Sequence, residues 1–129
     1  MDTNALLMCI APQSIYRKAW QSFLDGQYIL CVSNEVLEEY SEVLSRNINA
    51  SVSDFIVQTI LNRENVKLYD PHFRCNLIKS DPDDNKFVDC AFASNAKYIV
   101  TEDHHFDILK EVDFPRIEII GIKDFCLTL

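Results

Sequence analysis

The positions of apolar residues along the chain follow two different periods, which predict helices and strands in turn. Apolar residues three and four apart, the spacing of amphipathic helices, recur in the ranges 13–24, 33–44 and 53–63. Compact apolar runs, typical of buried strands, lie at 28–32, 66–69, 98–101 and 117–120. Shorter helical patterns cover 105–112 and 122–127. Strands that alternate with helices over short connections predict an α/β fold with a parallel sheet covered on both sides.

The clearest helix start lies at residues 80–84. Ser80 or Asp81 can cap the helix, Pro82 suits its first position, and the next two acids meet the positive end of the helix dipole. From Asp84, apolar residues follow at i+3, i+4 and i+7, so this acid heads the face that packs inward. Asp103 follows a buried strand, where ligands bind in open parallel sheets.

The first residues do not supply every element that this fold needs. A parallel sheet of this kind needs a central strand leading into Asp2, yet only Met1 precedes that acid. We therefore expect either a start upstream of Met1, or a first strand built from residues 1–7 in a shifted register. In either case residues 1–129 are expected to form one domain whose first strand is truncated at the N-terminus.

Composition narrows the class of protein. The 129 residues are 48% hydrophobic and 25% charged, an ordinary globular balance, and we find neither a membrane-spanning run nor a secretory leader, so the cytoplasm is the expected location. The five scattered cysteines argue against a disulfide framework and a zinc site. A net charge of −8 is unusual for a protein that binds nucleic acid, unless the acids gather at a metal site and on a surface for a basic partner.

Four acids are expected to converge at one end of the sheet. They are Asp2, Glu39, Asp84 and Asp103. Two carboxylates about 5 Å apart repel by roughly 3 kcal/mol at an effective dielectric constant near 20, so such a group calls for a cation or for protons. Oxygen ligands favour Mg²⁺ or Mn²⁺, and such an ion suits phosphodiester hydrolysis. No phosphate-binding glycine loop, nucleophile elbow or H-E-x-x-H motif points elsewhere.

These motifs together resemble a PIN domain, specifically the branch of toxins of prokaryotic toxin–antitoxin systems related to VapC-type ribonucleases. The resemblance is carried by Asp2-Thr3-Asn4, by residues 33–40 with Val43-Leu44, by residues 81–87 and by residues 99–103. It implies a metal-dependent endoribonuclease with a three-layer α/β/α fold and a central parallel sheet, using Mg²⁺ or Mn²⁺, commonly dimeric, and held inactive by an antitoxin protein.

The resemblance also implies roles for single residues. Asp2, Glu39, Asp84 and Asp103 match the catalytic and metal-binding quartet, Asn4 and Thr101 match polar residues that orient it, and Asp89 matches a supporting acid. The chain departs from the family pattern in two places. The usual strand before the first acid is absent, and Glu102 stands where a small or basic residue is more frequent.

Other interpretations of these residues stay open at this stage. Asp84 and Asp103 can each serve as helix caps, Glu39 can be a solvated helix acid, and His104-His105 can be an exposed helix start or a contact to substrate. A non-catalytic RNA-binding or partner-binding module of the same fold is the main alternative function. A phosphoacceptor domain of the receiver type is a weaker one, because Asp70 is available but Lys123 is poorly placed.

Overall fold

Helices make up most of the structure, which is a computed structural model that describes residues 1–113 and 116–129. The α-helices are α1 (Thr3–Ile10), α2 (Arg17–Leu24), α3 (Asn34–Asn47), α4 (Ala50–Leu61), α5 (Asn85–Ser94) and α6 (Ile122–Leu127). Two 3-10 helices are η1 (Pro82–Asp84) and η2 (His104–Glu111). The strands are β1 (Leu30–Val32), β2 (Val66–Leu68), β3 (Tyr98–Val100) and β4 (Glu118–Ile120).

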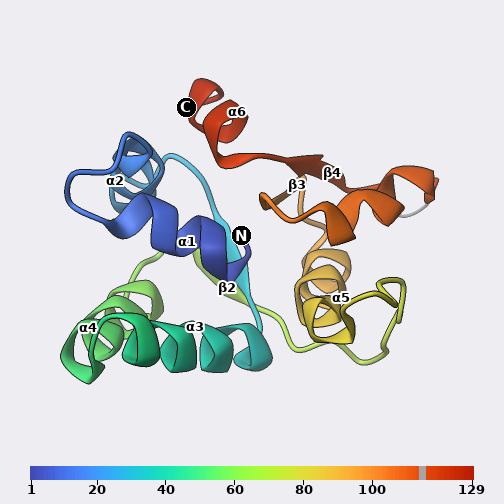
Figure 1. Ribbon diagram of the computed structural model, residues 1–129, viewed down its shortest axis with the longest axis horizontal. Helices are drawn as coiled ribbons and strands as arrows, with labels where there is room; N and C mark the ends of the chain where they lie inside the picture. The colour runs from blue at the N-terminus through green and yellow to red at the C-terminus, as the bar shows by residue number, and fades with distance from the viewer. Residues whose placement is uncertain (114–115) are drawn as a thin grey trace.

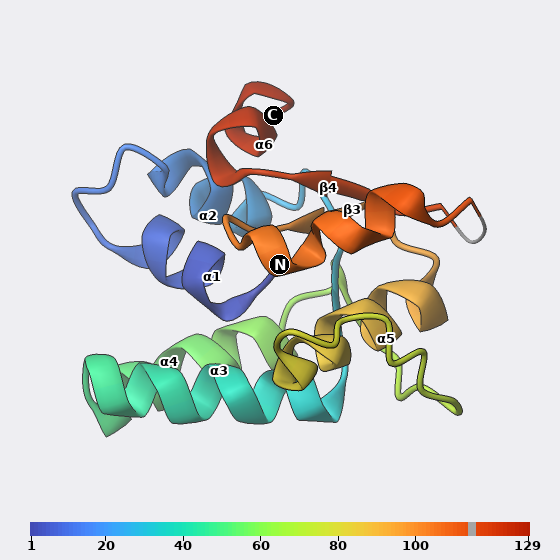
Figure 2. The same ribbon diagram turned by 45° about the vertical axis from the view of Figure 1, so that its right-hand side comes forward.

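Local capping explains where several predicted helices begin. The Ser33 hydroxyl accepts a hydrogen bond from the Val36 amide at the start of α3, as the sequence predicted. The Asn49 side chain does the same for Val52, so α4 begins three residues before the predicted Ser53. Helices α3 and α4 pack side by side below the rest of the chain (Figures 1 and 2).

The strands confirm the α/β class and the parallel pairing, but they do not form one central sheet. Strand β1 pairs in parallel with β2, and β3 pairs in parallel with β4, so the described strands make two separate two-stranded sheets. Figure 1 shows β3 and β4 together, apart from β2. The three-layer arrangement around a continuous sheet is therefore interrupted between β1 and β3.

Residues 1–7 are not a strand, so the prediction of a first strand in a shifted register was wrong. Helix α1 begins at Thr3 because Asp2 caps it: its Oδ1 atom accepts a hydrogen bond of 2.9 Å from the Ala5 amide. The backbone amide of Asp2 donates to the Val100 carbonyl at 2.9 Å. The residues before α1 therefore lie beside the end of β3.

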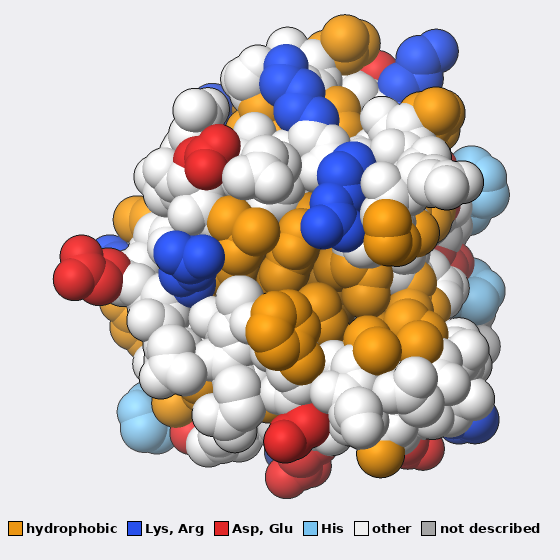
Figure 3. Space-filling model, turned by 90° about the vertical axis from the view of Figure 1, so that its left-hand side faces the viewer, with side chains coloured by type: hydrophobic (Ala, Val, Ile, Leu, Met, Phe, Trp, Pro, Cys, Tyr) orange, Lys and Arg blue, Asp and Glu red, His pale blue; other side chains and the backbone are white. Residues whose placement is uncertain are grey.

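The core joins both sheets to the helices around them. Its largest fully buried side chains include Tyr40, Phe23 and Phe106, and the five cysteines are free thiols. On the face shown in Figure 3, hydrophobic side chains gather in the middle with Lys and Arg side chains beside them, while acidic side chains lie toward its edges. Over the described residues, no helix has both the length and the apolar character needed to cross a membrane.

Candidate metal centre

The end of β3 brings Asp2 and Asp103 together through one hydroxyl. Thr101 follows the strand, and its buried hydroxyl donates to Asp2 Oδ2. The same hydroxyl accepts a hydrogen bond of 2.9 Å from the backbone amide of Asp103. Figure 2 shows the start of the chain beside β3 and the helix η2 that follows. Thr101 therefore holds both acids at the carboxyl end of β3, where the sequence placed them.

His105 links Asp103 to a second pair of acids. Its Nδ1 atom lies 3.1 Å from Asp103 Oδ1, 3.4 Å from Asp84 Oδ2 and 3.9 Å from Asp81 Oδ2. Asp81, Asp84 and His105 each offer one ligand atom, and these atoms lie within 4.8 Å of one another. This grouping gathers three elements at one point: the loop before η1, the end of η1, and the start of η2.

The carboxylates of this group are not used as helix caps at the start of α5. Neither Asp81, which precedes η1, nor Asp84, which precedes α5, makes a side-chain capping hydrogen bond. Asp103 does cap η2, since its Oδ1 accepts from the His105 amide at 2.9 Å. The capping interpretation therefore holds for Asp103, whereas the Asp84 carboxylate makes no capping hydrogen bond.

Burial and neighbouring negative charge together raise the pKa of Asp84. Partial burial, followed by the charge of Asp81, raises the pKa of this carboxyl to about 6, and the charges of Asp103 and Asp2 act in the same direction. Burial likewise raises the pKa of Asp2, against the hydrogen bond from Thr101. A divalent cation would relieve both effects, because it favours the ionised carboxylates.

Glu39 lies at the border of this group and is engaged by two other side chains. Its Oε2 accepts a hydrogen bond from the hydroxyl of Thr3, and its Oε1 lies 3.0 Å from Nζ of Lys86. The side chains of Glu39 and Lys86 are 18% and 16% exposed, so this is a partly buried ion pair. Thr3 directly follows Asp2, which places Glu39 on the same side of the molecule, with its charge already compensated.

The other residues predicted to support the site have different surroundings. Asn4 is exposed on the first turn of α1. Asp89 is buried in α5 and accepts a hydrogen bond of 2.9 Å from the Cys75 amide, which ties the preceding loop to the helix. Glu102 turns away from the acids and accepts from the Ile122 amide at 2.6 Å, so it serves the start of α6.

Three residues near the site were missed or undervalued by the sequence analysis. Asp81 was interpreted only as a cap, and His105 mainly as an exposed helix start. The third, Asn85, is buried and binds the loop before η1: its Oδ1 accepts from the Ile78 amide at 2.9 Å, and its Nδ2 donates to the Ile78 and Pro82 carbonyls at 2.8 and 3.1 Å. The spacing Asp81-x-x-Asp84 was the only sequence signal for the first of these.

Comparison with known families decides the assignment. The family model of the PIN domain matches residues 1–105. The chain belongs to the PIN domain family. PIN domains are generally nucleases, which is the kind of activity that the acidic group supports. No curated protein and no solved structure matches the chain.

The PIN match covers every acid discussed above and ends at His105. Strand β4 and helix α6 follow the matched region. The donor set of the site consists of carboxylate oxygens with one imidazole, which fits a hard divalent ion of the kind that PIN nucleases typically use.

Proposed function

We propose that this PIN domain is an endoribonuclease that hydrolyses RNA phosphodiester bonds with Mg²⁺ or Mn²⁺. One observation carries the proposal: Thr101 joins Asp2 to Asp103, and His105 joins Asp103 to Asp84, in a group where burial, followed by the charge of Asp81, raises the pKa of Asp84 to about 6. Such a group favours a cation, and a divalent cation can assist hydrolysis of a phosphodiester.

Each residue of the group has a distinct part in the proposal. Asp81, Asp84 and His105, whose ligand atoms lie within 4.8 Å of one another, would hold the ion together with Asp103 and Asp2, and Glu39 would add negative charge at its border. Thr101 fixes the orientation of Asp2, and His105 spans Asp103 and Asp84. A divalent ion in this place supplies positive charge to the phosphate and lowers the pKa of water. The Lys86 ammonium, paired with Glu39, is a cation beside the group that could also meet a phosphate.

Substitution of Asp84 tests the proposal. We expect Asp84→Asn to lower the rate of metal-dependent RNA cleavage by roughly 100-fold or more, because it removes a charged ligand. The matched control is Asp83→Asn in the same turn, whose side chain is 79% exposed and outside the metal-binding group. Its Oδ1 atom lies 3.4 Å from Lys86 Nζ, so this variant reports the effect of losing an exposed acid together with that ion pair. Rates are measured on a fluorescent RNA with Mg²⁺, with Mn²⁺ and with chelator, and unfolding curves show that both variants are folded.

Two results would contradict this assignment. Full activity in the Asp84→Asn variant would remove Asp84 from the site. Binding of RNA that is unaffected by chelator, with no cleavage by the unaltered chain, would instead favour the non-catalytic binding module. Equal losses in Asp83→Asn and Asp84→Asn would show a general effect of charge on this turn.

We further propose that the nuclease is the toxin of a toxin–antitoxin pair. The resemblance to the VapC-type branch supports this role, and the net charge of −8 suits a basic partner such as an antitoxin segment. Induced expression in a bacterial host should arrest growth, whereas Asp84→Asn should not. Growth at the normal rate under strong expression of active nuclease would argue against the toxin role while leaving the nuclease proposal intact.

A further inference from the structure

The carboxylate of Glu39 lies between residues that adjoin two acids of the metal centre. Its Oε2 atom accepts a hydrogen bond from the hydroxyl of Thr3, which directly follows Asp2. Its Oε1 atom lies 3.0 Å from Nζ of Lys86, two residues after Asp84. Both oxygens of Glu39 are therefore engaged, and among the described residues Glu39 supplies none of the three ligand atoms that lie within 4.8 Å of one another.

The position of Lys86 in α5 holds its ammonium at this carboxylate. Lys86 follows Asn85, whose amide binds the loop before η1 through three hydrogen bonds. A second carboxylate, that of Asp83, has its Oδ1 atom 3.4 Å from Nζ, but its side chain is 79% exposed. The side chains of Lys86 and Glu39 are 16% and 18% exposed. The pair with Glu39 is thus the better shielded from water.

The ammonium of Lys86 stays charged in this place. Burial lowers its pKa, but the carboxylates of Glu39 and Asp83 raise it, and the net shift is upward. A cation that binds the same oxygen of Glu39 would meet this fixed positive charge at short range, where like charges repel strongly in a partly buried site. Lys86 and a divalent ion therefore cannot both use Glu39 fully.

We propose that Lys86 is a positioning residue that keeps Glu39 from joining the ligands of the divalent ion, because the ammonium and the ion compete for one carboxylate. This role rests on the proposed metal centre and adds to it a control of ion affinity. While Lys86 neutralises Glu39, the cluster holds the ion without this acid. Without Lys86, Glu39 is free to add a negatively charged ligand, so the chain should hold the ion more tightly.

A double-mutant cycle separates this competition from a general effect of charge. It compares the unaltered chain with Lys86→Met, Glu39→Gln and the double variant, and the Mn²⁺ affinity of each is measured by electron paramagnetic resonance of the free ion. We expect Lys86→Met to raise the affinity about tenfold when Glu39 is present, and no more than about threefold when it is replaced, because only Glu39 can become a ligand. Loss of the positive charge alone would give the same gain in both backgrounds.

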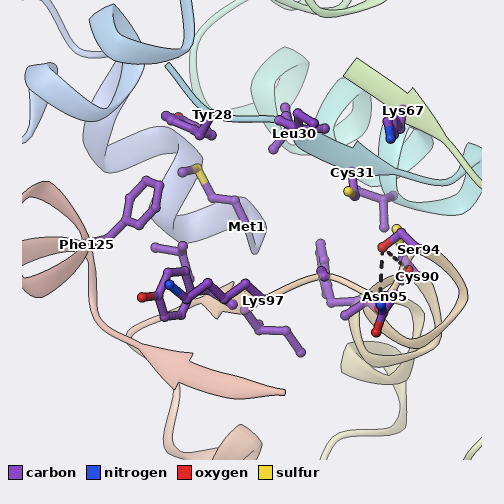
Figure 4. Close-up of a pocket in the computed structure, with 18 of the residues that line it drawn as sticks. Met1, Tyr28, Leu30, Cys31, Lys67, Cys90, Ser94, Asn95, Lys97 and Phe125 are labelled. Carbon is purple, nitrogen blue, oxygen red and sulfur yellow. Dashed lines mark hydrogen bonds between the residues drawn. The ribbon is translucent and has the colours of Figure 1, made fainter. Parts of the chain in front are cut away.

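Other lysine variants test whether the position of the charge matters. Lys97→Met removes the same charge at the opposite end of β3, where Lys97 lines a groove of about 650 Å³ between the two sheets (Figure 4). This variant should leave the Mn²⁺ affinity within about twofold of the unaltered value, because solvent and salt screen a distant exposed charge. Lys86→Arg keeps a cation beside Glu39, so it should preserve the affinity of the unaltered chain.

Urea unfolding in chelator shows whether each variant is folded. Lys86→Met leaves the partly buried carboxylate of Glu39 without its counter-ion, so the midpoint should fall, and the double variant should recover part of the loss. Lys86→Gln replaces Lys86→Met if the latter does not fold, because its neutral amide can still donate to Glu39. The Mn²⁺ concentration that gives half-maximal RNA cleavage should shift with the measured affinity.

Several outcomes would overturn the proposal. Equal gains from Lys86→Met in the presence and absence of Glu39 would show that Lys86 acts only through its charge. A lower Mn²⁺ affinity in Lys86→Met would show that the ion pair supports the cluster. If the unaltered chain and every variant failed to bind Mn²⁺, the metal centre would be wrong and the role of Lys86 with it. Mn²⁺ binding and RNA cleavage with no gain from Lys86→Met would remove only the role of Lys86.

Discussion

At the scale of single residues, the ionised carboxylate of Asp84 opposes folding of the metal-free protein. The folded-state pKa of Asp84 is raised to about 6 from an ordinary value of 3.8, mainly by burial and by Asp81. Folding then favours the protonated carboxyl, so the stability from this group is fully present below its unfolded pKa and is lost as pH rises through about 6. Metal-free protein should therefore lose stability between about pH 4 and pH 6 on account of Asp84.

Asp84→Asn should remove the loss of stability that ionisation of Asp84 causes above about pH 6. We expect the variant to unfold at higher urea concentration than the unaltered chain at pH 7.5 in chelator, with a gain of roughly 1–2 kcal/mol, since partial exposure screens the full effect. The gain should shrink on going to pH 4.5. Urea unfolding curves at several pH values measure it, with Asp83→Asn as the control for loss of an exposed acid. A loss of stability in Asp84→Asn at every pH would show that Asp84 is structural.

The single residues also show what a sequence can disclose about a site. Asp84 was found because it heads a helix face and Asp103 because it follows a strand, whereas Asp2 was found through its match to the family motif. The structure gathers the three acids through Thr101 and His105. Their metal-binding roles stay predictions. Asp81 and His105 were not assigned to the group because their part depends on the path of the loop before η1, which no local period in the sequence specifies.

At the scale of elements, the spacing of apolar residues predicted most helices and strands, and capping side chains fixed where several helices begin. The period of residues 33–44 and the Ser33 cap gave α3 correctly. The first strand in a shifted register failed because an aspartate cap at Asp2 outweighs the weak strand pattern of the residues after it. The prediction of a single central sheet was not confirmed, because the described strands form two separate pairs. Strand pairing joins segments far apart in the chain, and periodicity gives no information about it.

The loop before η1 depends on one buried amide. Asn85 accepts from the Ile78 amide and donates to two carbonyls, and Ile78 itself is 2% exposed. Asn85→Ala leaves the buried amide and carbonyl of Ile78 without these partners, so we expect a loss of roughly 2–4 kcal/mol in the free energy of unfolding. Mn²⁺ affinity should fall as well, because this loop and η1 carry Asp81 and Asp84.

Asn47→Ala is the matched control for this element, since Asn47 is exposed at the end of α3. It should change the free energy of unfolding by no more than about 0.5 kcal/mol. Both variants are measured by urea unfolding and by Mn²⁺ titration. Unaltered stability in Asn85→Ala would mean that water replaces the amide and that the loop does not rely on it.

At the scale of the whole molecule, the net charge of −8 and the acidic group predict how metal affects folding. An ion that binds the folded chain alone stabilises it by mass action, by about 2.7 kcal/mol at 100 times its Kd. We expect Mn²⁺ at that concentration to raise the free energy of unfolding by about this amount. Asp84→Asn should lose most of the increment.

Screening of the overall charge must be separated from binding at the site. Sodium chloride at matched ionic strength weakens repulsion among all exposed acids, and it should stabilise the unaltered chain and Asp84→Asn equally. The increment that Mn²⁺ adds beyond the salt is the part that belongs to the site, because only binding there distinguishes the two proteins. If salt reproduced the whole effect of Mn²⁺, or if Asp84→Asn kept the full increment, the acids would act as a diffuse charge and not as a metal centre.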